Sequence, residues 1–286
     1  MTRQFENYLH SFWKNEKPFF VPNEYGEKLG RTLKRKISNR FTFDKFIYHF
    51  KDGSHVAALH RHRRNHYFCR IDLKRFFYTI NRNRVKRALK SIGIPKPEFY
   101  ARWSTVKNPF GGSGYVVPYG FVQSPIVATL VLAKSPIGIF LRSLPLTITA
   151  SVYMDDICLS AADEEPLREA FAGLLKAVEE AGFTLNGEKL REPADYIDIF
   201  NCSLENGITA VLPNRIAEFH QEPRTAAAEK AFAEYCGIVK SHTWRVGAKR
   251  LKKRMYFQAR RLAAVAPVQA PPPAAAAPVQ PPTPQS

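Results

Sequence analysis

Two adjacent aspartates, Asp155 and Asp156, lie in the middle of a segment that otherwise has the composition of a β-hairpin. Apolar β-formers flank the pair on both sides over residues 146–160. Such residues favour strands, so the two carboxylates are expected at the tip of a hairpin. A third aspartate, Asp72, ends another apolar stretch that begins at Tyr67. Carboxylates gathered in this way repel one another unless a cation neutralises them.

Oxygen ligands select a hard divalent cation, so Mg²⁺ or Mn²⁺ is expected at Asp72, Asp155 and Asp156. Two such ions can clamp the attacking and leaving oxygens of a phosphoryl transfer. An isolated Asp-Asp pair is usually a polar turn, but the strand pattern and the second strand ending in Asp favour a metal site. The four cysteines form no CxxC pair, which disfavours a zinc module.

The charge balance predicts a polyanionic partner. Lys and Arg number 43 against 25 Asp and Glu, which gives a formal net charge of +18. The N-terminus has no apolar signal-like region, and the uncharged stretch between Lys107 and Lys134 contains too many glycines and prolines for a membrane helix. We therefore expect a cytoplasmic protein that does not contact a membrane.

The order of elements predicts an α+β fold in which helices back an antiparallel sheet. Asn206-Gly207 indicates a type I′ hairpin turn. Short helices are expected up to about residue 50, longer helices over residues 82–92, 124–141 and 166–180 and from residue 226, and strands over residues 67–73, 146–160, 196–204 and 208–212.

Tyr153-Met154-Asp155-Asp156 resembles the catalytic signature of reverse transcriptases, and further segments resemble the family's other motifs in the same order. RIDLKRFFYTI (residues 70–80) resembles the first catalytic motif, PYGFVQSP (118–125) the template- and nucleotide-positioning motif, LNGEKL (185–190) the motif with a lysine, and IDIFNCSLENGITAVLPNRI (197–216) the primer-grip hairpin. The resemblance covers roughly residues 40–260 and is greatest to bacterial retron-type and phage-defence-associated enzymes.

The resemblance implies a right-hand polymerase fold with an antiparallel-sheet palm (a ferredoxin- or RRM-like core), small fingers and a helical thumb. It divides the chain into N-terminal helices and fingers (1–66), a palm (67–205) with a fingers insertion (about 93–122), a primer-grip return strand (206–215), a basic helical thumb (216–265) and a disordered Pro/Ala-rich tail (266–286).

The resemblance also implies roles for individual residues. Asp72, Asp155, Asp156 and the carbonyl of Leu73 would hold two Mg²⁺ ions, with Mn²⁺ as the alternative, and Lys189 would protonate the leaving pyrophosphate. The ring of Phe77 would leave no room for a 2′-hydroxyl. The expected nucleotide contacts are Phe77, Tyr119, Gly120, Gln123, Arg61, Arg63 and Arg64; the expected primer and template contacts are Tyr153, Met154, Lys249, Arg250, Lys252 and Lys253.

The function implied is an RNA-directed DNA polymerase that copies a structured noncoding RNA in bacterial anti-phage defence. Its partners would be the RNA template, the DNA product and dNTPs, together with a partner protein or a second copy of the chain. The family usually has glutamine where Tyr119 stands, which leaves open an atypical or template-independent DNA polymerase. An RNA-binding scaffold with a polymerase-like fold and an RNA-directed RNA polymerase are further alternatives; Phe77 and Met154 argue against the last.

Overall fold

The computed structural model describes residues 7–242. By its internal contacts the chain divides into two units, residues 1–245 and residues 246–286. The second unit lies outside the described residues. So do the expected template contacts Lys249, Arg250, Lys252 and Lys253 and the tail at residues 266–286.

A four-stranded antiparallel sheet positions the aspartates. Its strands lie in the order β6 (Thr149–Tyr153), β7 (Asp156–Ala161), β3 (Tyr67–Asp72) and β8 (Arg191–Ala194). In the register of β3 against β7, Asp72 lies opposite Asp156. The end of β3 and the β6–β7 turn therefore meet at one edge of the sheet, as the strand pattern predicted.

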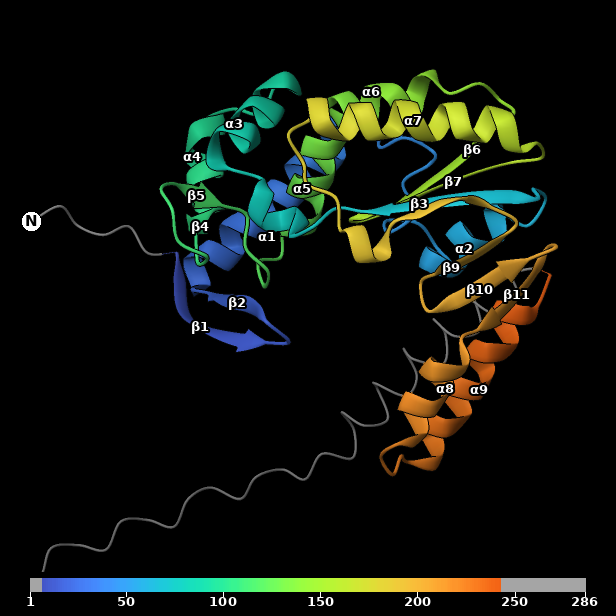
Figure 1. Cartoon of the computed structure of the whole chain (residues 1–286). Coiled ribbons are helices and arrows are strands. Elements are labelled where there is room, and N and C mark those ends of the chain that lie inside the picture. The colour runs from blue at the N-terminus through green and yellow to red at the C-terminus, as the bar shows by residue number, and fades with distance from the viewer. Residues whose placement is uncertain (1–6, 243–286) are drawn as a thin grey trace, which may run out of the picture. The chain divides into compact units, whose positions relative to one another are not determined.

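Helices cover both faces of this sheet (Figure 1). Helices α6 (Pro136–Ser143) and α7 (Glu164–Glu180) lie over one face, and α2 (Ser54–Arg61) lies at the other. Beside them, α5 (Ser124–Ala133) is buried on nearly every side, as expected for a helix in the centre of a core. Helix α3 (Arg82–Ser91) packs against α5 and confirms the helix expected there.

The single helix expected over residues 124–141 is instead two helices, α5 and α6, which meet at a bend of 63°. Pro136 explains the break, because proline has no backbone N–H and the residue before it is disfavoured in a helical conformation. Within residues 7–242 no single helix is long and apolar enough to cross a membrane, and this bent pair meets that criterion by length and composition only.

The N-terminal part differs from the short helices predicted there. It is a hairpin of β1 (Tyr8–Lys14) and β2 (Lys17–Pro22), followed by one long helix, α1 (Glu24–Arg40). The ring of Phe20 is buried against Tyr8, with ring centroids 4.9 Å apart. This tertiary packing makes β2 a strand, and the local sequence gives no sign of it. The side chain of Asn23 then caps α1.

A second, three-stranded antiparallel sheet contains β9 (Tyr196–Ile199), β10 (Cys202–Glu205) and β11 (Ile208–Val211). The one strand predicted over residues 196–204 is two, because Phe200 and Asn201 both have positive φ (56° and 61°) and form a turn. The turn predicted at Asn206-Gly207 is confirmed, with φ of 48° and 75°.

The other elements are short or follow this sheet. They are η1 (Phe76–Thr79), α4 (Pro97–Trp103), β4 (Val106–Lys107), β5 (Tyr115–Val116), η2 (Gly187–Lys189), α8 (Pro213–His220) and α9 (Ala226–Lys240). Helix α9 confirms the helix expected from residue 226.

A buried histidine joins α2 to the central sheet. His62, at the end of α2, is completely buried, and its ring nitrogens lie 2.7 Å from Ser160 Oγ on β7 and 2.8 Å from Ser151 Oγ on β6. Burial lowers the pKa of His62 to about 3. The ring is therefore neutral, and it donates to one serine hydroxyl while it accepts from the other.

We expect His62 to make the stability of the protein depend on pH. An unfolded histidine binds a proton near pH 6.5, whereas His62 in the folded chain does not until about pH 3. Its contribution to the free energy of unfolding is complete above pH 6.5 and falls by about 1.4 kcal/mol per pH unit below it. Urea unfolding at several pH values should therefore show a shallower pH slope for His62→Gln than for the wild type. His66→Gln, at an exposed site, is the control, and equal slopes for wild type and His62→Gln would contradict this expectation.

Candidate active site

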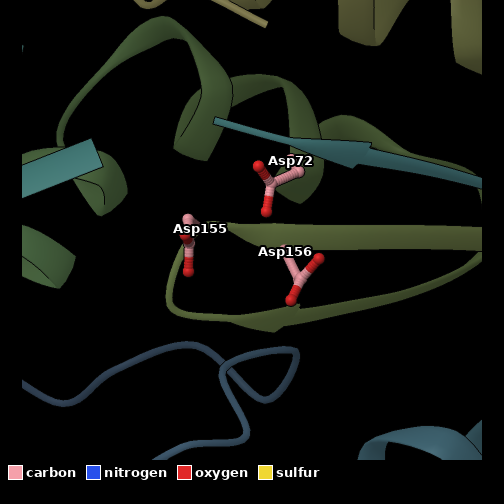
Figure 2. Close-up of side chains that lie close together, drawn as sticks. All are labelled: Asp72, Asp155 and Asp156. Carbon is pink, nitrogen blue, oxygen red and sulfur yellow. The ribbon is translucent and has the colours of Figure 1, made fainter. Parts of the chain in front are cut away.

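Three carboxylates meet where β3 and the β6–β7 hairpin end (Figure 2). Asp72 is the last residue of β3, Asp155 lies in the hairpin turn, and Asp156 is the first residue of β7. One carboxylate oxygen from each residue lies within 4.8 Å of the others. The structure thus brings together the three residues that the sequence proposed as metal ligands. Asp72 is buried, with 4% of its surface exposed.

The hairpin turn is strained and is held from outside. Met154 has a φ of 59°, a left-handed conformation that costs a non-glycine residue about 1–2 kcal/mol. Its backbone N–H donates to His49 Nδ1 at 3.2 Å. The other ring nitrogen of His49 lies 2.7 Å from Thr129 Oγ1, on α5. Burial lowers the pKa of His49 to about 4, so Nδ1 stays free to accept. The backbone N–H of Leu73 donates to Asp155 O at 3.0 Å and ties the turn to the end of β3.

Asp72 is paired with a lysine. Lys189 Nζ lies 3.1 Å from one carboxylate oxygen of Asp72, and Asn186 Nδ2 donates to the other at 3.1 Å. The Lys189 side chain is about half exposed, at 51%, whereas Asp72 is buried beneath it. The lysine expected at the site is therefore next to the carboxylates and open to solvent.

Asp156 is paired with an arginine that the sequence analysis did not propose. Arg70 Nε and Nη2 donate to one oxygen of Asp156 at 2.9 and 2.6 Å. Arg70 precedes Asp72 by two residues on β3, so both side chains project from the same face of the sheet. This two-residue spacing in the sequence could have indicated that Arg70 lies at the site. Arg70 also donates to the carbonyl of Asp198 at 2.9 Å, which connects the site to β9.

Of the three carboxylates, Asp155 differs from the other two in its ion pairing. Among residues 7–242 it forms no ion pair within 4.0 Å. Burial, and then the charges of Asp156 and Asp72, raise the pKa of Asp155 to about 6. Burial also raises the pKa of Asp156, although Arg70 offsets part of this effect. The two cations therefore compensate the three carboxylates only in part, and the all-oxygen donors of the cluster suit a hard divalent cation. The carbonyl of Leu73 as a further ligand stays a prediction.

Two cavities adjoin the hairpin tip, and Met154 and Asp155 line both. The first cavity, of about 410 Å³, is lined on its other sides by Lys17, Phe77, Tyr119, Gly120, Phe121, Ser124 and Pro125. The second cavity, of about 440 Å³, is lined by Asp156 and by His55, Tyr153, Phe200, Asn201, Arg215, Phe232 and Tyr235. A carboxylate cluster between two cavities can act on two bound groups at once.

The first cavity contains the predicted nucleotide contacts Phe77, Tyr119 and Gly120. The rings of Phe77 and Tyr119 pack edge to face, with centroids 4.6 Å apart. Burial and the nearby charge of Asp155 raise the pKa of Tyr119, so its phenol keeps its proton and can donate a hydrogen bond. Gly120 has a φ of 101°, and a Cβ there would lie 2.1 Å from Phe20 O. Only glycine permits this close approach of β2.

The approach of β2 brings an unpredicted lysine into the first cavity. The backbone N–H of Phe20 donates to Tyr119 O at 3.0 Å, which fixes the β1–β2 hairpin against this segment. Lys17, at the start of β2, lines the cavity, and its Nζ lies 5.7 Å from the centre of the Tyr119 ring. No local motif marks Lys17, because its position depends on the docking of the hairpin.

The second cavity has an aromatic wall. The rings of Tyr153 and Phe200 pack edge to face, with centroids 5.3 Å apart. His55 Nε2 lies 3.0 Å from the hydroxyl of Tyr235, and Ser54 Oγ lies 3.1 Å from the hydroxyl of Tyr153. Fixed aromatic surfaces of this kind suit stacking against nucleic acid bases.

Four predicted nucleotide contacts do not line the first cavity. Gln123 is buried, and its Nε2 donates to the carbonyl of Trp103 at 3.3 Å. Arg63 Nη2 donates to the carbonyl of Val239 at 2.6 Å, so this arginine joins the loop after α2 to the end of α9. Arg61 and Arg64 are exposed and line neither cavity beside Asp155.

Comparison with known proteins identifies the class. Residues 18–198 match the family described as reverse transcriptase (RNA-dependent DNA polymerase). That match spans more than half of the chain, so the chain belongs to the reverse transcriptase family, which is a family of nucleotidyltransferases. No curated protein matches the sequence.

Solved structures resemble the fold at low sequence identity. The BmCPV RNA-dependent RNA polymerase at quiescent state has a TM-score of 0.52 and 12% identity, over 75% of this chain and 23% of that one. A foamy viral protease-reverse transcriptase in complex with double-stranded DNA has a TM-score of 0.47 and 17% identity, over 77% of this chain and 33% of that one. The chain thus spans a third or less of these proteins. The fold is a right-hand polymerase fold with an antiparallel-sheet palm, which confirms the fold predicted from the sequence.

We expect Asp155→Asn to lose metal binding and to be more stable than the wild type in the absence of metal. The raised pKa of Asp155 means that its ionisation costs the folded state stability as the pH rises through about 6. Without divalent metal at pH 8, the neutral amide should increase the free energy of unfolding by about 1–3 kcal/mol. Mg²⁺ or Mn²⁺ should raise the melting temperature of the wild type and not that of Asp155→Asn. Asp195→Asn, at an exposed site, is the control and should respond to the metal as the wild type does.

Proposed function

We propose that the protein is an RNA-directed DNA polymerase that adds dNTPs to a primer by metal-assisted phosphoryl transfer. The observation that supports this most is the position of Asp155, which lines both the cavity with Phe77 and Tyr119 and the aromatic cavity with Tyr153. An incoming nucleotide in the first cavity and a primer end in the second would meet at the carboxylates. Membership of the reverse transcriptase family supports the same reaction.

In this proposal Asp72, Asp155 and Asp156 would hold two Mg²⁺ ions, or Mn²⁺, and the metal would supply Lewis-acid stabilisation of the reacting phosphate and oxygens. Arg70 fixes the carboxylate of Asp156 and offsets part of the rise in its pKa that burial causes. Lys189, next to Asp72 and open to solvent, donates a proton to the leaving pyrophosphate.

The two cavities divide the binding of the substrates. The ring of Phe77 lies under the nucleotide sugar and excludes a 2′-hydroxyl. The phenol of Tyr119 donates a hydrogen bond to the same sugar. Lys17 contacts the triphosphate of the nucleotide, a substrate for which Arg61, Arg63 and Arg64 were expected as contacts from the sequence. Tyr153 and Met154 contact the primer end.

The template that we propose is a structured noncoding RNA, copied in a bacterial retron-type or phage-defence system in the cytoplasm. The supporting observations are the sequence resemblance over roughly residues 40–260 and the net charge of +18, which attracts a polyanion. The domain division proposed from the sequence assigns residues 67–205 to the palm and residues 216–265 to a thumb that grips the duplex. A partner protein or a second copy of the chain is a further proposed partner.

Primer extension tests the proposed activity. The purified protein should extend a DNA primer on an RNA template with dNTPs and Mg²⁺. Asp155→Asn should reduce incorporation to background while RNA affinity persists, because the basic surfaces are unchanged. Undiminished synthesis by this variant would overturn the assignment of the catalytic centre. Binding without any synthesis by the wild type would favour an RNA-binding scaffold.

Tyr119 favours a second candidate, a template-independent DNA polymerase. Its phenol has a donor and an acceptor on a single oxygen, where the family's usual glutamine has a separate amide donor and acceptor, and its ring fills part of the first cavity. The same assay without template separates the two functions. Untemplated addition at the rate of templated synthesis would support the second candidate.

Two substitutions in the first cavity should separate recognition of the sugar from recognition of the triphosphate. Phe77→Ala should raise rNTP incorporation relative to dNTP by about tenfold or more, because the proposed barrier is steric. Lys17→Gln should raise KM about tenfold for both nucleotides alike, because a charge-assisted hydrogen bond is worth about 1.5–3 kcal/mol. Steady-state kinetics with each nucleotide measures both effects. An unchanged sugar preference in Phe77→Ala would make Phe77 a core residue only.

A further inference from the structure

A third cavity, of about 390 Å³, lies in the helical layer, where α3, the α5–α6 junction and the end of α7 meet. None of its lining residues lines the two cavities at Asp155. Its charged and polar lining residues are Arg84, Arg87, Ser91, Lys134, Ser135 and Glu180. The cavity is therefore a site of its own, and the proposed polymerase reaction gives it no role.

The cavity has an excess of positive charge that the described chain does not neutralise. Arg84, Arg87 and Lys134 face one carboxylate, Glu180, and none of the three cations forms an ion pair within 4.0 Å among residues 7–242. By contrast, Lys86 on the same helix is paired with Glu98 at 3.0 Å. Burial and the neighbouring Arg87 lower the pKa of Arg84, as expected when two guanidinium groups repel each other.

Packing fixes two of these cations in place. The guanidinium of Arg84 lies over the ring of Phe183, 4.0 Å from its centre. Lys134 Nζ lies over the ring of Phe41, 4.7 Å from its centre. Cations held on aromatic rings lose little further conformational entropy when an anion binds, so the site is preorganised.

The start of α6 adds to the positive potential. Pro136 begins this helix at the cavity, and the hydroxyl of Ser135 donates to Leu132 O at 2.7 Å. No side chain caps the helix. Its N-terminal dipole therefore acts together with the three cations in attracting an anion.

We propose that this cavity binds backbone phosphates of the RNA and anchors the RNA away from the catalytic carboxylates. The inference rests on the proposed function, in that RNA is the template. The lining residues include three cations and no aromatic ring on which a base could stack. Such a site recognises phosphate and not sequence, which suits an RNA strand better than a free nucleotide. Arg84 and Arg87 contact the phosphate oxygens, and Lys134 adds a point charge.

The test compares two triple variants with the same change in net charge. Arg84, Arg87 and Lys134 are replaced by Gln in the first, and the exposed Lys28, Lys34 and Lys176, which line none of the three cavities, are replaced by Gln in the second. Binding of a fluorescent structured RNA is measured by anisotropy over a range of NaCl concentrations. Each phosphate contact that is lost should lower the slope of log affinity against log salt by about one.

The cavity triple variant should lose two to three of these phosphate contacts and, at physiological salt, on the order of tenfold or more in RNA affinity relative to the control. Equal slopes and affinities for the two triple variants would overturn the proposal. Because Arg84 packs on Phe183 and Lys134 packs on Phe41, the single variant Arg87→Gln, at an exposed position, serves as the second test. It should keep the wild-type melting temperature and still flatten the slope.

Two further arms separate the alternatives. Single-nucleotide addition on a short RNA–DNA duplex that fills only the catalytic cleft should be unchanged in the cavity variant. The anisotropy measurement of RNA binding does not depend on activity. A wild type that synthesises nothing would therefore contradict the proposed function without contradicting the proposed RNA site. ATP, tested by equilibrium dialysis, should not bind in a cavity-dependent way. ATP binding that the triple variant abolishes, with RNA affinity unaltered, would overturn the RNA proposal in favour of a free nucleotide.

Discussion

The structure around the site depends on holding three negative charges within 4.8 Å of one another in a mostly buried position. The β3–β7 register that sets Asp72 opposite Asp156 creates this repulsion, and two cations reduce it. Arg70 neutralises Asp156 and Lys189 neutralises Asp72, while Asp155 is left with a raised pKa. The protein therefore compensates the carboxylates only in part. The remaining negative charge is what a divalent cation would bind, at a cost in stability to the metal-free protein.

The position of Asp155 also depends on the β6–β7 turn, whose residues do not favour the conformation that it adopts. Met154 adopts a conformation in which glycine would be the easier residue, and a hydrogen-bond chain through His49 to Thr129 holds it there. Thr129 belongs to α5, which is packed on nearly every side and so serves as a fixed support. Strain at the tip is offset by burial elsewhere. Because Met154 and Asp155 line both cavities, this one support sets the geometry of both.

The sequence was sufficient where the determinants are local. The apolar run ending at Asp72 and the β-formers flanking Asp155 identify strands by composition, and the register then follows from the sheet. The sequence was insufficient where tertiary packing determines the position of a side chain. Gln123 lies within a motif, but its amide faces the core beside Trp103, where a side chain on Gly30 of α1 would clash with it. Arg63 was expected from the sequence to contact the nucleotide, yet the carbonyl of Val239 in α9 accepts a hydrogen bond from it. Lys17 reaches the site only because Gly120 allows β2 to approach.

The charges of the chain operate on two length scales with opposite signs. At long range the net charge of +18 attracts polyanions of any sequence. Cations such as Arg84 and Arg87, which form no ion pair among residues 7–242, extend that attraction over the helical layer. At the hairpin tip the sign reverses, since Asp155 and its neighbours leave a local excess of negative charge. A nucleic acid drawn to the surface would be repelled at this point unless a divalent cation lay between its phosphates and the carboxylates. A divalent cation held by these carboxylates would therefore lie between the protein and the phosphate, which is where phosphoryl transfer requires a metal.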